Sequence, residues 1–64
     1  MGELLHKNAT ITWKTPKSIM TMSKVDIYDD GKAYRLSYDT MEDGKLRRVI
    51  GSRVWKKNVI SIES

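Results

Sequence analysis

The chain has 64 residues, no cysteine and a formal net charge of +4 at neutral pH. A chain of this length forms one domain that buries only about 60% of its unfolded surface, so its core is thin. Without cysteine it has no disulfide or cysteine-ligated zinc to support that core. No apolar run approaches the roughly 18 residues of a membrane span, and the first residues lack the apolar centre of a signal peptide. We therefore expect a single intracellular, cytoplasmic domain over residues 1–64 that does not bind membranes.

Charge is distributed unevenly along the chain. Residues 1–25 carry a net charge of +3, residues 26–43 carry −4 and residues 44–57 carry +6 with no acid among them. A basic segment beside strand-like aromatic residues is typical of proteins that bind a polyanion. Many small domains are basic only for solubility, so charge alone leaves both interpretations open.

The first half of the chain predicts a hairpin. Residues 9–14 alternate apolar with threonine-rich polar positions, which is typical of a strand. Pro16, the only proline, interrupts this pattern, and residues 19–23 predict a second strand that pairs back. For residues 1–8 we expect a flexible segment or a short helix.

The second half predicts a three-stranded meander and a closing strand. Strands are expected from "SKVDIY", over residues 33–39 and over residues 46–52, joined by turns in which Gly31 and Gly44 supply a positive φ. Residues 53–58 suggest irregular structure or one helical turn, and the β-branched residues in 58–62 predict a strand. The fold class is therefore all-β: a small SH3-like barrel in which a two-stranded hairpin packs on a three-stranded meander. An OB-fold is the alternative, although it usually requires a longer chain.

The sequence offers no convincing catalytic or metal site. His6 is the only histidine, and no cysteine accompanies it. Two adjacent pairs of acids, at 29–30 and 42–43, precede glycines in the expected turns, where aspartate is common for its own hydrogen bonding. We expect no enzyme, no metal and no cofactor.

The expected meander has two different faces. Alternation places Ile27, Tyr34, Leu36 and Tyr38 on an apolar face that should pack on the first hairpin. The opposite face carries Tyr28, Ala33, Arg35 and Ser37. If the turn after Met41 keeps simple pairing, this face is extended by Arg48, Ile50 and Ser52. A one-residue slip would instead turn Ile50 into the core, and both orientations remain open.

Residues 26–52 resemble the triple-stranded sheet of the seven-kilodalton Sulfolobus-type DNA-binding chromatin proteins. The shared features are an aromatic residue before a Gly-Lys turn, a strand that ends in Tyr-Asp, a glycine-containing turn that ends in Lys, and a strand with Arg and Ser. Here they correspond to Tyr28, Gly31-Lys32, Tyr38-Asp39, Gly44-Lys45, Arg48 and Ser52. Upstream, "ATITWK" is similar to the first hairpin of that family, so the resemblance covers residues 9–52.

The resemblance implies that the sheet lies across the minor groove of duplex DNA with little sequence preference. Asp30 and Ala33 stand where the family has an apolar wedge, and the C-terminal helix of the family is missing, so the resemblance does not extend to kinking of the duplex. The residues that it and the exposed face together imply for nucleic-acid binding are Trp13, Lys14, Tyr28, Lys32, Ala33, Arg35, Ser37, Arg48, Ile50 and Ser52.

Three functions are compatible with this sequence. The first is a monomeric, non-enzymatic module that binds duplex DNA with little sequence preference through the exposed face of the three-stranded sheet. The second is an SH3-like protein-interaction module that uses Tyr28, Tyr34, Trp55 and the acidic segment. The third is a small RNA-binding barrel in which aromatic side chains stack on bases.

Overall fold

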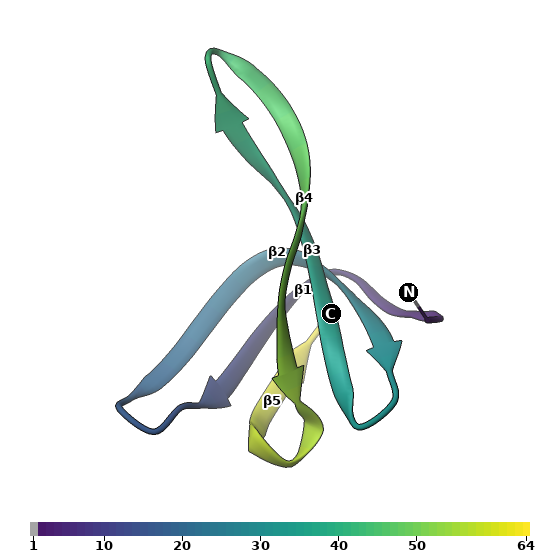
Figure 1. Ribbon diagram of the computed structural model, residues 1–64, viewed down its shortest axis with the longest axis vertical. Helices are drawn as coiled ribbons and strands as arrows, with labels where there is room; N and C mark the ends of the chain where they lie inside the picture. The colour runs from purple at the N-terminus through teal and green to yellow at the C-terminus, as the bar shows by residue number, and fades with distance from the viewer. Residues whose placement is uncertain (1) are drawn as a thin grey trace.

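The protein consists almost entirely of β-strands, as the alternating pattern predicts. The computed structural model describes residues 2–64. The strands are β1 (Leu4–Lys14), β2 (Ile19–Asp30), β3 (Ala33–Glu42), β4 (Lys45–Trp55) and β5 (Val59–Glu63), with a 3-10 turn, η1 (Lys56–Asn58), before the last strand. They form one antiparallel, open sheet in the order β4-β3-β2-β1-β5, with the β3–β4 hairpin projecting at one end (Figure 1). The all-β, barrel-like fold class is therefore confirmed.

β1 begins earlier than the sequence predicts. Leu4–Asn8, expected to be flexible or in a short helix, belong to β1 and pair with the end of β2, with Leu4 opposite Tyr28. The expectation for these residues was wrong because the "ELLHK" segment has too few residues for a stable helix, whereas pairing along β2 satisfies its backbone groups. Met1 lies outside the described residues.

β2 is a single strand of 12 residues where the sequence predicted two. Ser23 and Lys24 lie in a β-bulge. Ala9 faces Val25 and Ile11 faces Met22, so three steps along β2 match two along β1 and β2 has one extra residue there. β1 has a matching extra residue on the other side of the Ala9–Val25 pair. Asn8 and Lys24 take left-handed backbone angles, φ 54° and 58°. A third register shift lies between Leu4 and His6. With these irregularities one continuous strand, β2, pairs with both β1 and β3.

The two tight turns have the geometry that the sequence predicts. Asp30 pairs with Ala33 and Glu42 with Lys45, so each loop has two residues. Gly31 and Gly44 have φ values of 70° and 75°. Asp43 is also left-handed (φ 52°), as expected for an Asp-Gly hairpin turn.

β4 continues to Trp55, beyond the predicted end at residue 52. A further bulge lies in this strand: Ser37 faces Ile50 and Arg35 faces Arg53, so three steps along β4 match two along β3. Residues 53–55, expected to be irregular, are therefore strand, and only Lys56–Asn58 form a helical turn. The bulge determines which side chains of β4 share a face with Arg35.

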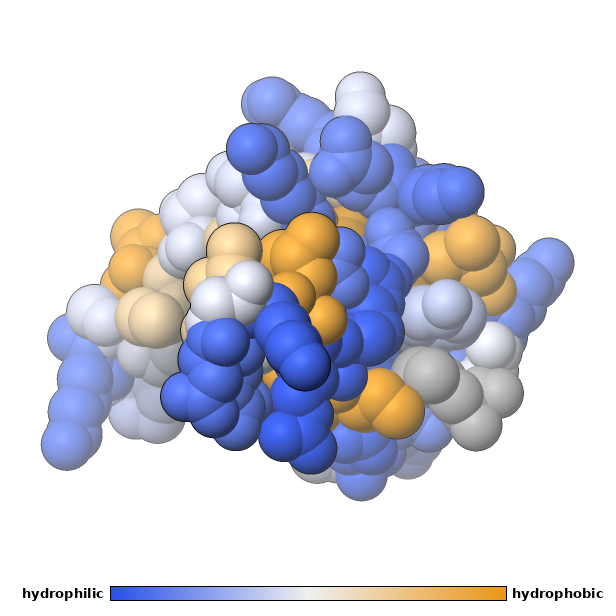
Figure 2. Space-filling model, turned by 90° about the horizontal axis from the view of Figure 1, so that it is seen from above, coloured by the Kyte–Doolittle hydropathy of each residue, from blue (hydrophilic) through white to orange (hydrophobic). Residues whose placement is uncertain are grey.

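The core lies between the β1–β2 hairpin and the inner face of the meander. It contains Ile27 and Leu36, as predicted, and half-buried Tyr34 and Tyr38 pack against it. Its remaining buried members are Ala9, Ile11, Val25 and Val54. Because the core is one layer of small and medium side chains, most of the molecule is surface, and on the face seen in Figure 2 hydrophilic residues predominate with separate hydrophobic patches between them.

The C-terminal strand β5 is confirmed and pairs with β1. The register jumps at Ile60, since Trp13 faces Val59 while Thr12 faces Ser61. Val59 and Ile62 therefore pack against the core, and Ile60 is 56% exposed. No helix in residues 2–64 has the length and apolar composition needed to cross a membrane.

Candidate nucleic-acid interface

The outer face of the meander is assembled in rows that run across β2, β3 and β4. One row is Tyr28–Arg35–Arg53 and the next is Asp26–Ser37–Ile50. Trp55 lies opposite Ala33 at the end of the face beside the β2–β3 turn. Ser52 was predicted to lie on this face. The bulge in β4 shifts the register, so that Arg53 is the residue opposite Arg35.

The structure separates the predicted site residues by accessibility. Ile50 is 59% exposed on the outer face, so the orientation that placed it outside the core is the one adopted. Lys32 and Ser52 are exposed and Tyr28 is half-buried. Ala33 is fully buried and Ser37 is only 4% exposed. Ala33 and Ser37 therefore present almost no side-chain surface to a ligand in this structure, and their contact with a nucleic acid stays a prediction.

Trp13 and Lys14 do not join the other predicted residues. Both lie on β1, which the sheet order separates from β3 by the width of β2. Trp13 packs against the core, and Lys14 is exposed where β1 ends. The predicted set is thus divided between two parts of the molecule.

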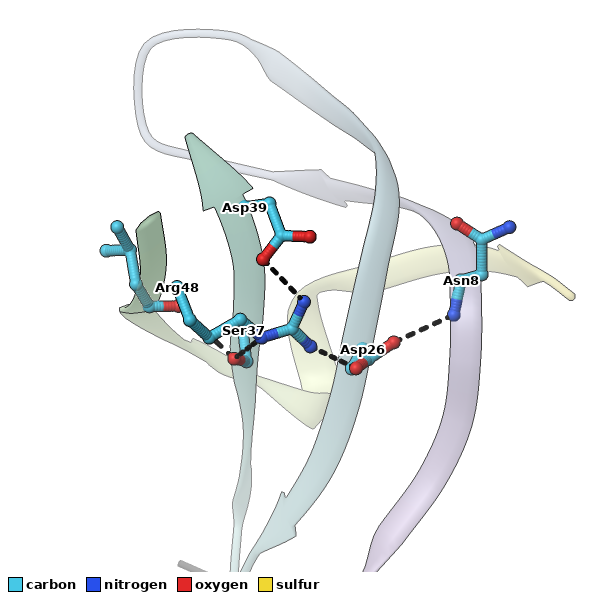
Figure 3. Close-up of polar contacts among 6 residues, drawn as sticks. Asn8, Asp26, Ser37, Asp39 and Arg48 are labelled. Atoms are coloured by element: carbon cyan, nitrogen blue, oxygen red, sulfur yellow. Dashed lines mark hydrogen bonds and ion pairs between the residues drawn. The ribbon is translucent and has the colours of Figure 1, made fainter. Parts of the chain in front are cut away.

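Arg48 is held by a network of polar side chains on three strands (Figure 3). Its Nε donates to Ser37 Oγ at 2.9 Å, and its Nη1 lies 3.2 Å from Asp39 Oδ1. Its Nη2 pairs with Asp26 Oδ2. Ser37 Oγ in turn donates to the carbonyl of Val49 at 3.2 Å. Three nitrogens of the guanidinium are therefore engaged within the fold, although the Arg48 side chain is 45% exposed.

Asp26 connects this network to β1. Its Oδ1 accepts the backbone N–H of Asn8 at 2.9 Å, next to the bulge in β1. This hydrogen bond lowers the pKa of Asp26 below its ordinary value of 3.8, and the charge of Arg48 lowers the pKa further against the opposing effect of burial. The carboxylates of Asp26 and Asp39 also raise the pKa of Arg48, chiefly through the hydrogen bond with Asp39.

Arg35 and Arg53 share a carboxylate. Arg53 Nε lies 2.9 Å from Asp30 Oδ2 and Arg35 Nη2 lies 3.5 Å from the same oxygen. Arg35 Nη1 also donates to the carbonyl of Gly51 at 3.3 Å, inside the bulge. Since Arg48 is paired with Asp26 and Asp39, the three arginines of the outer face meet three aspartates. This part of the surface is close to electrically neutral.

Positive charge accumulates instead at the end of the sheet beside the β2–β3 turn. We call this the basic end; beyond the group formed by Arg35, Asp30 and Arg53 it carries three lysines, Lys32, Lys56 and Lys57, of which Lys56 is paired with Asp29. Lys32 and Lys57 take part in none of the ion pairs among residues 2–64, so the positive charge of this end comes chiefly from them. In Figure 1 this end carries the β2–β3 turn and the loop between β4 and β5, and lies away from the β3–β4 turn.

A recess of about 620 Å³ opens at the basic end, which we call the Trp55 recess. Its lining residues are Gly31, Lys32, Trp55, Lys56 and Lys57. Trp55 is 47% exposed, and the Arg53 guanidinium lies 5.3 Å from the centre of its ring, within cation–π range. The recess thus combines an exposed aromatic ring with three lysines and no carboxylate in its lining.

The walls of this recess are tied together. The backbone N–H of Lys56 donates to the carbonyl of Lys32 at 3.0 Å, which joins η1 to the β2–β3 turn. Lys56 Nζ lies 2.7 Å from Asp29 Oδ1 and 5.3 Å from the centre of the Tyr34 ring. The hydrogen bond to Asp29 raises the pKa of Lys56. Lys32 and Lys57 take part in none of the ion pairs between residues 2–64, so their ammonium groups remain available.

Most of the Trp55 recess was not predicted from the sequence. Of its lining residues only Lys32 was predicted to contact a nucleic acid, and Trp55 was considered only for protein binding. The signal was present as "RVWKK", where a tryptophan lies within a basic run. Among the described residues, no cluster of three or more histidine or acidic side chains could hold a metal ion.

No family model, no curated protein and no solved structure matches the chain. The resemblance to the seven-kilodalton chromatin proteins therefore stays a prediction, and an argument for function depends on the residues of this chain.

Proposed function

We propose that this protein is a non-enzymatic nucleic-acid-binding module with little sequence preference, and that it contacts the nucleic-acid backbone at the basic end. The observation that carries the proposal is the Trp55 recess, where Lys32 and Lys57 flank an exposed tryptophan without a carboxylate in the lining. Cationic side chains that contact phosphates and aromatic rings on which bases stack are combined in proteins that bind nucleic acid without sequence preference.

The nucleic-acid contact proposed here lies at the basic end and not at the centre of the outer face. Duplex DNA binding as expected from the sequence depends on Arg35, Ser37 and Arg48. Ser37 is buried, and the two arginines are engaged with aspartates. Replacing an ion pair by a phosphate contact returns less free energy than adding a phosphate to an unpaired lysine, because the attraction between the arginine and its aspartate is lost and the remaining carboxylate repels the phosphate.

Fluorescence anisotropy tests this proposal. It measures the binding of labelled single-stranded and duplex oligonucleotides at several salt concentrations. The wild-type protein should bind at low salt, with log K falling linearly as log salt concentration rises. Lys32→Ala and Lys57→Ala should each reduce the slope by roughly 0.7–0.9, as expected for the loss of one phosphate contact.

Matched controls separate a localised contact from general charge. Lys17 lies in the β1–β2 turn and Lys45 at the start of β4 beside the β3–β4 turn, both exposed. Lys17→Ala and Lys45→Ala should leave the slope unchanged. Absence of binding to every oligonucleotide at low salt would contradict the proposal, and so would an equal effect of all four lysine changes.

A further inference from the structure

We infer that the Trp55 recess receives one unpaired base of a single-stranded nucleic acid, which stacks on the indole of Trp55 while Lys32 and Lys57 contact the adjacent phosphates. This inference deepens the proposed function and rests on it, since it names the class of nucleic acid. It is carried by the geometry of the recess.

The indole of Trp55 is oriented before any ligand binds. Asp30 holds Arg53 through a 2.9 Å contact with Nε, and the Arg53 guanidinium lies over the Trp55 ring. Arg53 does not line the recess, whereas Trp55 does. The Trp55 surface that borders the recess is therefore separate from the contact with Arg53, and it is where we place the stacked base.

The recess is large enough to hold one base. A recess of about 620 Å³ lies within the roughly 300–1,000 Å³ of small-ligand sites. Bases within a duplex are stacked on one another and their faces are not accessible, so only an unpaired base can present a face to Trp55. The Lys56 N–H to Lys32 O hydrogen bond fixes the distance between the two walls, which lowers the ordering cost of binding.

The choice of occupant follows from charge. Three of the five lining residues are lysines, and Lys56 is already paired with Asp29. The two remaining ammonium groups favour a ligand with an anion on either side of an aromatic ring. A nucleotide within a strand has that pattern, since each base lies between two phosphates.

The test compares the affinity of the protein for a thymidylate strand of ten nucleotides with its affinity for an abasic strand of the same length, which has the same phosphates and no bases. The wild-type protein should bind the abasic strand about tenfold more weakly or worse, which is the scale of one lost base stack. Trp55→Ala should remove this difference and leave the salt slope unchanged. In the Trp13→Phe variant, Trp55 is the only tryptophan, and oligothymidylate should quench its fluorescence more than the abasic strand does.

Two further measurements can overturn the inference. Equal affinity of the wild-type protein for the oligothymidylate and the abasic strand would do so without any variant, so misfolding cannot confuse the result. An oligoglutamate peptide that binds as tightly as oligothymidylate would assign the recess to an acidic protein. If Lys32 and Lys57 set the salt slope for duplex and single strand alike and no base dependence is seen, the proposed function stands and this inference fails. If no nucleic acid binds at low salt, both fail.

Discussion

Arg48 on β4 reaches across β3 to pair with Asp26 on β2, although these two strands are not neighbours in the sheet. On its way the guanidinium covers Ser37, the one buried polar side chain among the described residues. Asp26 then accepts a hydrogen bond from Asn8 on β1. One arginine thus connects side chains from three strands to the backbone of a fourth, and its role is to stabilise the sheet.

Arg48→Ala should lower the melting temperature by several degrees. The change leaves Asp26, whose side chain is 16% exposed, without its cationic partner, and opens the cover over Ser37. Removing the cation leaves the half-buried Asp26 carboxylate with the Asn8 N–H as its remaining partner, and an underpaired carboxylate that is largely shielded from water costs stability. Thermal unfolding followed by circular dichroism measures the effect.

The neighbouring Arg47 provides the matched control. Its guanidinium lies 3.2 Å from Glu42, but the two side chains are 68% and 55% exposed. Exposed pairs of this kind contribute little to stability. Arg47→Ala should therefore unfold close to the wild-type temperature, and similar losses for both variants would show that the Arg48 network is no more than a surface ion pair.

Acid should weaken the fold through Asp26. Its pKa is lowered in the folded protein, chiefly by the Asn8 N–H, so the unfolded chain binds a proton at higher pH than the folded chain does. The stabilisation by Asp26 is complete above its ordinary pKa of 3.8 and is lost as pH falls through the lower folded value. Asp26→Asn should be less stable than wild type near pH 7, and the gap should narrow below about pH 4.

Urea denaturation at a series of pH values from about 7 to about 2.5 measures this gap. Asp43→Asn is a suitable control, because Asp43 lies in the β3–β4 turn and joins none of the ion pairs within residues 2–64. The Asp43→Asn variant, which removes an exposed carboxyl of the β3–β4 turn, is the reference against which the change in the Asp26→Asn gap is measured. A gap for Asp26→Asn that changes with pH no more than this reference does would remove Asp26 as a source of acid sensitivity.

Much of the fold could be predicted from the sequence, since two-residue alternation and Gly-containing turns act locally. Gly31 and Gly44 determine both meander turns, and the apolar face that contains Ile27 and Leu36 follows from their spacing. The bulges could not be predicted in this way. A bulge inserts a residue where cross-strand packing requires a sharper bend, and Lys24, Ser52 and Ile60 have no sequence signature that separates them from ordinary strand residues.

The same limit explains the candidate site. Arg35, Arg48 and Ile50 lie on the outer face as predicted, because the turn at 43–44 keeps the register. The pairing of the arginines with Asp26, Asp30 and Asp39 was not predictable, since it depends on which residues face each other across three strands. Trp55 was expected outside the sheet, because the alternating pattern does not indicate the bulge that brings Arg53 and Trp55 to this face.

Lys24 marks a site where the chain is strained. It has a left-handed backbone angle of 58° in the bulge of β2, and its side chain is exposed. Non-glycine residues lose roughly 1–2 kcal/mol in this conformation. Lys24→Gly should relieve that strain at a cost in unfolded-chain entropy, for a net gain of up to about 1 kcal/mol.

Lys14→Gly is the corresponding change in extended strand, and it should lower stability by about 0.5–1 kcal/mol. Both variants lose the same exposed, positively charged side chain, so the comparison isolates the backbone. Chemical denaturation gives the two free energies of unfolding. If the two changes destabilise equally, the bulge at Lys24 does not carry the strain that its backbone angle indicates.

Leu36 and Ile50 provide the sharpest test of the two-faced meander. Leu36 is 1% exposed in the core, whereas Ile50 is 59% exposed on the outer face of the adjacent strand. Leu36→Ala should cost about 2–5 kcal/mol, which is comparable to the whole stability of a domain of this size, roughly 3–10 kcal/mol at 0.05–0.15 kcal/mol per residue. Ile50→Ala should stay within about 0.5 kcal/mol of wild type, because an exposed side chain loses little burial. The slip that places Ile50 inside the core leaves Leu36 there too and makes both changes costly, so a large loss for Ile50→Ala in urea denaturation would show that β4 pairs in the other register and that Arg48 cannot reach Asp26.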